Sequence, residues 1–203
     1  MELDELAQLD VDDQWLILLG RIAKETVWME TQLRGLHAQL RHGDATREHL
    51  FATPDRWGDL HREAKQMVEK LKVEKDVRVA ILDAVAAAHA ANKGRNEYMH
   101  RELLRHEQWD TEEPPTERQA SVAPGDRLRI KISNPNGIPA PEPVTLDGAH
   151  QLVSDLIGAG WRLRFARLHL AARGHWKSEL TAHVVGTWDG NADLIGGDDD
   201  PND

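Results

Sequence analysis

Apolar residues recur at intervals of three and four along much of the chain, and this helical period limits the folds available to it. From Asp12 or Asp13, either of which suits a helix N-cap, the first pattern runs for about 30 residues and ends at Gly43. Its inward positions are predicted to be Leu16, Leu19, Ile22, Ala23, Thr26, Met29, Leu33, Leu36 and Leu40. A helix of this length gains most of its stability by burying its apolar face against other helices.

Three further segments show the same period. A shorter helix is predicted from about Asp59 to Leu71, after a linker marked by Pro54 and Gly58. A third begins near Lys75 and continues to about His106, and a fourth runs from about Leu146 to Ala172. The inward face of the third is predicted to hold Ile81, Leu82, Val85, Ala88, His89, Asn92, Asn96, Met99, His100 and Leu103. We therefore expect an all-α fold, a bundle of four to five helices.

The segment between the last two long helices has a different composition. Residues 109–144 hold seven of the nine prolines, and Leu128 to Ile132 alternate as a strand does. We expect a proline-rich, partly β-hairpin insertion there. Residues 1–186 are assigned to the helical domain, and the Gly- and Asp-rich residues 187–203 to an acidic disordered tail.

The formal net charge of −10 comes from the two ends of the chain. Residues 1–13 and 189–203 carry six acids each and no lysine or arginine, and the remaining residues hold 25 bases against 23 acids. The net charge therefore neither excludes nor supports a polyanionic partner for the body of the protein. The absence of cysteine rules out disulfides and thiolate metal sites.

The start of the chain, Met1–Glu5, lacks the basic residues and apolar run of a signal peptide. No apolar stretch approaches the ~18 residues that a membrane helix requires. We expect a cytoplasmic protein with no membrane partner.

The third helix carries polar residues where apolar ones are expected. Asn92, Asn96 and His100 share the predicted inward face, and Arg95 lies beside them. Polar side chains on such a face cost free energy unless they are paired or serve a function. The end of this helix is therefore the candidate functional site.

These residue types suit cleavage of RNA by its own 2′-hydroxyl. That reaction needs a base, an acid for the leaving oxygen, and positive charge near the phosphate. His100 suits the acid–base roles, Arg95 can hold a phosphate, and Asn96 can orient a partner or the substrate. Arg95 and His100 lie about 140° apart around a helix, within the reach of an arginine. One helix supplies a single histidine, whereas a two-fold dimer would supply two.

The spacing alone carries little information. Arg-x4-His also occurs as Arg56/His61, Arg101/His106 and Arg164/His169, which we interpret as solvated surface. The alternative for Arg95, Asn96 and His100 is a structural hydrogen-bond network. No histidine or acidic spacing indicates a metal site.

Two other features have competing interpretations. Trp15, Trp28 and Trp161 lie within predicted helices, where core packing is the usual role of tryptophan. The basic run Arg162, Arg164, Arg167, Arg173 and Lys177 is either a phosphate-facing surface or a solvated helix face.

The stretch Arg95-Asn96-Glu97-Tyr98-Met99-His100 resembles the Arg-x4–6-His motif of HEPN domains, in the subset with asparagine after the arginine. The segments Leu19–Ala23 and Glu30–Leu33 are similar to the first helix of that family. The resemblance covers roughly residues 15–173. Some family members continue the motif with a tyrosine two residues after the histidine; here Arg101 and Glu102 follow, so that regulatory feature is not expected.

The resemblance implies an HEPN-like bundle that forms a homodimer and cleaves single-stranded RNA without a metal or other cofactor. Arg95 and His100 would be catalytic, with Asn96, Asn92 and Tyr98 supporting them or binding substrate. The setting would be toxin–antitoxin or defence, with an antitoxin or regulatory protein as a further partner. The alternative is a non-catalytic HEPN-like module that mediates interactions or binds RNA or nucleotides.

Overall fold

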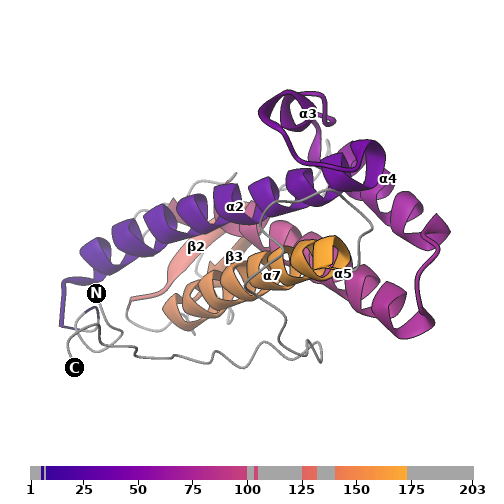
Figure 1. The fold of residues 1–203 in the computed structure, drawn as a ribbon. Helices are drawn as coiled ribbons and strands as arrows, with labels where there is room; N and C mark the ends of the chain where they lie inside the picture. Colours follow the sequence, from indigo (N-terminus) through magenta and orange to yellow (C-terminus); the bar gives the residue numbers. More distant parts are fainter. Residues whose placement is uncertain (1–5, 7, 100–102, 105–124, 132–139, 173–203) are drawn as a thin grey trace, which may run out of the picture. The chain divides into compact units, whose positions relative to one another are not determined.

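The computed structural model describes residues 6, 8–99, 103–104, 125–131 and 140–172 (Figure 1). This part of the chain is predominantly helical, as predicted. Its helices are α2 (Val11–His42), α3 (Arg47–Phe51), α4 (Trp57–Lys70), α5 (Lys75–Met99) and α7 (Leu146–Ala172). None of them is both long and apolar enough to cross a membrane. The HEPN-like arrangement of these helices remains a prediction.

Helix α2 differs from the sequence prediction at its beginning. The cap is Asp10, whose Oδ1 accepts from the Asp12 backbone N–H at 2.9 Å, so the helix begins before the predicted caps. Trp15 and Leu18 are buried, whereas Leu16, predicted to face inward, is 71% exposed. The Trp15 indole donates to the Gly125 carbonyl at 2.7 Å, and this bond accompanies the burial of the Trp15 side of the helix.

Two other helix predictions were incomplete. Helix α5 was predicted to continue to His106, but its described part ends at Met99 and Leu103–Leu104 form strand β1. Pairing of these residues with a strand competes with helix propensity and wins here. The short helix α3 was not predicted; Thr46 caps it by accepting from the His49 backbone N–H at 3.3 Å.

Three strands form one antiparallel sheet in the order β1-β2-β3. Strand β2 (Arg127–Lys131) lies beside β3 (Ala140–Val144) in Figure 1, with Arg127 opposite Val144 and Lys131 opposite Ala140. Strand β3 contains Pro141 and Pro143, which lack a backbone donor and suit a strand at the edge of a sheet. Residues 105–124 and 132–139 lie outside the described residues, so the insertion as a whole remains a prediction.

The chain divides into two compact units, and each of the long helices α2, α5 and α7 has residues in both. Unit 1 comprises Met1–Thr31 and Ala86–Gly160, and unit 2 comprises Gln32–Val85 and Trp161–Asp203. The largest fully buried side chains of unit 1 are Leu6, Leu18, Ile22, Met29 and Leu156. Those of unit 2 are Leu33, Leu36, Leu60, Ile81, Leu163 and Leu170. Each unit therefore has its own apolar core.

Close helix packing in unit 1 depends on glycine. A Cβ at Gly160 of α7 would overlap the indole ring of Trp28 on α2, so the ring lies where only a hydrogen fits. Gly158, two residues earlier on the same helix, has no atom within 4 Å of the corresponding position. The two glycines therefore have different roles despite their proximity in the sequence.

Gly160→Ala is expected to lower the free energy of unfolding by about 1–3 kcal/mol, because the added methyl must displace a rigid indole ring. Gly158→Ala is the matched control. It should raise the free energy of unfolding by roughly 0.5–1 kcal/mol, since alanine restricts the unfolded chain and meets no atom in the folded one. Urea unfolding followed by circular dichroism measures both. Equal midpoints for the two variants would contradict the packing argument.

Candidate active site at the end of helix α5

The polar residues of α5 are less uniformly buried than predicted. Asn92 is buried at 9% exposure, but Asn96 is only half-buried. Ala88 and Ala91 are buried as well, and Gly94, three residues further on, meets a neighbouring helix. A Cβ at Gly94 would lie 2.9 Å from the Leu152 side chain of α7, so the helices approach closely there. The prediction that both asparagines lie on a buried face is therefore confirmed for Asn92 only, since Asn96 is half-buried.

Arg95 and Asn96 are joined by their side chains. The Arg95 guanidinium donates through Nη1 to the Asn96 side-chain oxygen at 3.1 Å, and both residues are half-buried. A guanidinium carries five N–H donors in a planar fork, the geometry that suits a phosphate. The contact orients Arg95 within the last two turns of α5. The predicted catalytic histidine, His100, follows five residues later in the sequence.

His100 lies outside the described residues, as do Arg101 and Glu102. Its distance from Arg95 therefore remains a prediction. In the sequence it directly follows Met99, the last described residue of α5.

Tyr98 links α5 to two other elements of unit 1. Its ring stacks on Trp15 of α2, with centroids 6.3 Å apart and planes inclined by 29°. Its hydroxyl lies only 2.6 Å from the position that a Cβ at Gly148 of α7 would occupy. Burial, followed by the negative charge of Asp126, raises the pKa of Tyr98 above its ordinary value. Tyr98 therefore packs α5 against α2 and α7, three residues after Arg95.

The partners of Tyr98 are themselves fixed. Arg127 of β2 pairs with Asp12 of α2, and its guanidinium lies 5.9 Å from the centre of the Trp15 ring. Thr145 accepts from the Gly148 backbone N–H at 2.9 Å and so caps α7. These contacts were not predicted. The sequence signal that could have found one of them is Gly148, a poor helix former that lies in the first turn of a long helix.

Filling the space beneath the Tyr98 hydroxyl is expected to destabilise the protein. Gly148→Ala should lower the free energy of unfolding by about 1–3 kcal/mol, since the new methyl overlaps the oxygen. Tyr98→Phe should restore part of this loss, because the ring carbon Cζ is 4.0 Å from the same position, an ordinary contact. A double-mutant cycle from denaturant unfolding measures the coupling. Additive effects would show that the hydroxyl and Gly148 do not meet.

A second polar cluster lies in unit 2 and was not predicted. His37 of α2 is 1% exposed, and its Nε2 lies 3.1 Å from Glu63 of α4, which also pairs with Arg41. The other ring nitrogen, Nδ1, is buried without a hydrogen-bond partner among the described residues. Burial lowers the pKa of His37 below 6.5, while Glu63 opposes the shift and Arg41 and His42 add to it. Protonation would place a donor at Nδ1 in the core, so the neutral form suits this position.

The lowered pKa makes stability depend on pH. The unfolded chain takes up the His37 proton first as the pH falls through 6.5, so the free energy of unfolding should fall between about pH 7.5 and about pH 5.5. His37→Gln has no such proton and should lose less stability over the same range. Urea midpoints of both proteins at the two pH values give the comparison. The same loss in both would assign the pH dependence to other groups.

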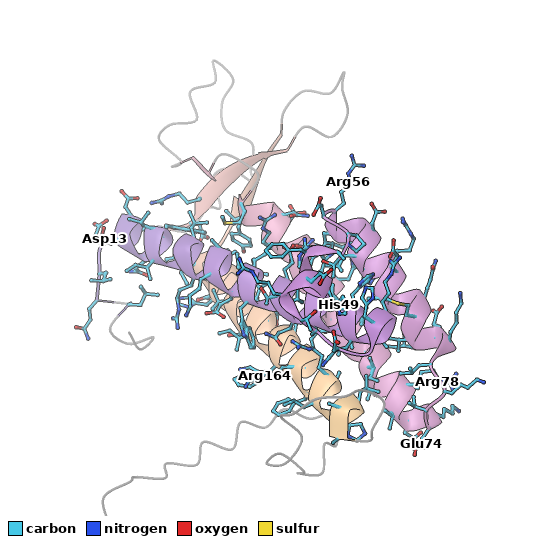
Figure 2. The ribbon with its side chains drawn as sticks, turned by 45° about the horizontal axis from the view of Figure 1, so that its top comes forward. Asp13, His49, Arg56, Glu74, Arg78 and Arg164 are labelled. Atoms are coloured by element: carbon cyan, nitrogen blue, oxygen red, sulfur yellow. The ribbon has the colours of Figure 1, made fainter. Side chains whose placement is uncertain are left out.

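Two of the other Arg-x4-His pairs begin at arginines that the structure describes, and both arginines belong to unit 2. Arg56 is exposed beside α4, and Arg164 is exposed on the C-terminal half of α7 (Figure 2). Within the described ranges, no three histidine or acidic side chains converge as metal ligands would.

Comparison with known proteins identifies no relative: no protein-family model, curated protein or solved structure matches this chain.

Proposed function

We propose that this chain is an HEPN-like, metal-independent endoribonuclease that acts on single-stranded RNA as a homodimer. The observation that supports the proposal is the bond between the side chains of Arg95 and Asn96, two half-buried residues near the end of α5 at Met99. An arginine oriented in this way can meet a phosphate with two parallel N–H groups. His100 follows five residues after Arg95 in the sequence.

The reaction follows from these residue types. His100 in one subunit removes the proton of a ribose 2′-hydroxyl, and the 2′-oxygen attacks the adjacent phosphorus. The bond from phosphorus to the 5′-oxygen breaks, and a protonated His100 supplies a proton to the leaving oxygen. The products carry a 2′,3′-cyclic phosphate and a 5′-hydroxyl. Arg95 offsets the negative charge that develops on the phosphorane-like transition state.

The cleft would be complete only in a dimer. One subunit provides one histidine, so the second acid–base group comes from the same residue of a second copy across a two-fold axis. We expect the setting to be toxin–antitoxin or defence, with an antitoxin or other regulatory protein as a further partner.

The test is cleavage of labelled RNAs by the purified protein in EDTA, with the product ends identified. His100→Ala and Arg95→Ala should each lower the rate by about 100-fold or more, the usual loss on removing an acid–base or charge-stabilising group. Asn96→Ala should lower it several-fold, since it loses one orienting hydrogen bond of about 1 kcal/mol. Adding an excess of the His100→Ala protein to the wild-type protein should lower the rate, because a mixed dimer holds one His100 instead of two.

Arg56→Ala combined with His61→Ala is the control for this experiment. The pair has the same residue types at the same spacing but lies on another helix, so its removal should leave the rate unchanged. Cleavage that survives His100→Ala, or no cleavage of varied RNAs by the wild-type protein, would refute the proposed activity.

The second candidate function is a non-catalytic module of the same fold. The burial of Asn92 and the bond from Arg95 to Asn96 support it, since both are also typical of a structural polar network. The two candidates differ in stability. A structural His100 predicts that His100→Ala lowers the free energy of unfolding by about 1–3 kcal/mol or more, whereas a histidine facing a cleft predicts little change.

A further inference from the structure

We propose that the C-terminal half of α7 is a binding surface for single-stranded RNA, formed by a pair of stacked aromatic rings between two exposed arginines. The surface is defined by Trp161, Arg162, Arg164 and Phe165, all in unit 2. It rests on the proposed function only for its choice of RNA as the ligand. Its geometry is independent of the Arg95 pair.

Trp161 was expected to pack in the core, and it is only half-buried. Trp161 and Phe165 are only half-buried, and their rings stack on each other with centroids 5.7 Å apart and planes inclined by 29°. The inward face of this part of α7 is occupied instead by Leu163, Ala166 and Leu170, each at 0% exposure. At 100° per residue the stacked pair lies on the side of α7 opposite Leu163 and Leu170, where it is half-buried and partly accessible to a ligand.

An arginine completes the aromatic pair. The Arg164 guanidinium lies 5.0 Å from the centre of the Trp161 ring, and its side chain is exposed on the C-terminal half of α7 (Figure 2). This cation–π contact holds the guanidinium near the ring while its edge can still meet a phosphate. Arg162 is exposed on the other side of Trp161 in the helix. A base can therefore stack at the aromatic pair while its neighbouring phosphates meet the arginines.

The local charge favours a polyanion. Residues 156–172 contain three arginines and no acidic residue, although the whole chain has a net charge of −10. The third arginine, Arg167, donates to the side-chain oxygens of Gln32 at 2.9 Å and Gln39 at 3.0 Å. Burial and then the positive charge of Arg164 lower the pKa of Arg167, so these two guanidinium groups share a positive local potential.

The combination favours single-stranded nucleic acid over other polyanions, and the proposed function makes RNA the expected ligand. A duplex hides its bases, so it would use the arginines but not the rings. An acidic peptide would likewise gain from charge alone. Single-stranded nucleic acid uses both, because every base has a face that stacks on an aromatic ring.

The experiment uses the full-length protein and a fluorescein-labelled 2′-O-methyl oligouridine, which lacks the attacking hydroxyl and stays intact whether or not the protein cleaves RNA. Arg162→Ala combined with Arg164→Ala should weaken binding. It should also reduce the slope of log affinity against log salt by about 1.4, since each phosphate contact with a single strand contributes about 0.7. Trp161→Leu should weaken binding with little change in this slope, because stacking releases no counterions.

Arg56→Ala combined with Arg62→Ala is the matched control. It removes two exposed arginines of unit 2 at α4 and should leave the affinity and the salt slope close to those of the wild type. Circular dichroism melts of every variant exclude loss of folding. The arginine pair at α7 is exposed, so its removal is a fair test even where Trp161→Leu destabilises the helix.

Wild-type affinity and salt slope in the α7 arginine variant would overturn the proposal, as would an equal loss in the α4 control. Displacement of the RNA by a polyglutamate peptide of equal charge would assign the surface to an acidic protein instead. Because the probe is not cleaved, binding can succeed where the cleavage assay fails, and the two proposals stand or fall separately.

Discussion

The close packing of helices in each unit depends on glycines that lie opposite large side chains. In unit 1, Gly160 faces Trp28, Gly94 faces Leu152 and Gly148 faces the Tyr98 hydroxyl. In unit 2, a Cβ at Gly35 would overlap the guanidinium of Arg167. A helix without a side chain at the contact brings its backbone close to the neighbour, and the large side chain fills the space that remains. These contacts set the rotation of the helices about their axes, and other side-chain positions follow from it.

The candidate active site is an example of this dependence. Gly94 and Tyr98 lie on the side of α5 that meets α7, and Arg95 lies between them in the sequence. Gly94 meets Leu152, and Asn96, two residues further along α5, is half-buried and its side-chain oxygen accepts from Arg95. The polar pair is thus oriented by apolar contacts on the same helix. A polar pair placed on the contact face itself would have been sealed from any substrate.

The second unit shows how titratable side chains withdrawn from water are accommodated. Arg167 and His37 are both removed from water, and burial lowers the pKa of each. Amide oxygens of Gln32 and Gln39 accept from Arg167, and Glu63 bonds His37. Removing a charged group from water carries a penalty that such partners offset. The exposed arginines of α7 carry no such penalty, and this is why they suit a polyanionic ligand.

Helix positions could be predicted from the sequence because the apolar period extends over many turns: α7 was predicted at its observed bounds, and α2 and α4 to within a few residues. Arg95, Asn96 and Asn92 could be singled out as candidates from residue type and helical context, and their functional role remains a prediction. The sequence did not determine which side of a helix turns inward where two apolar patterns overlap, as with Trp15 and Leu16, or which glycines meet a neighbour. Nor did it show that Tyr98 packs against Gly148 or that Trp161 lies outside the core. Apolar periodicity shows only which side of a helix is apolar. The features listed above depend on the shape of the neighbouring helix, which only the tertiary structure supplies.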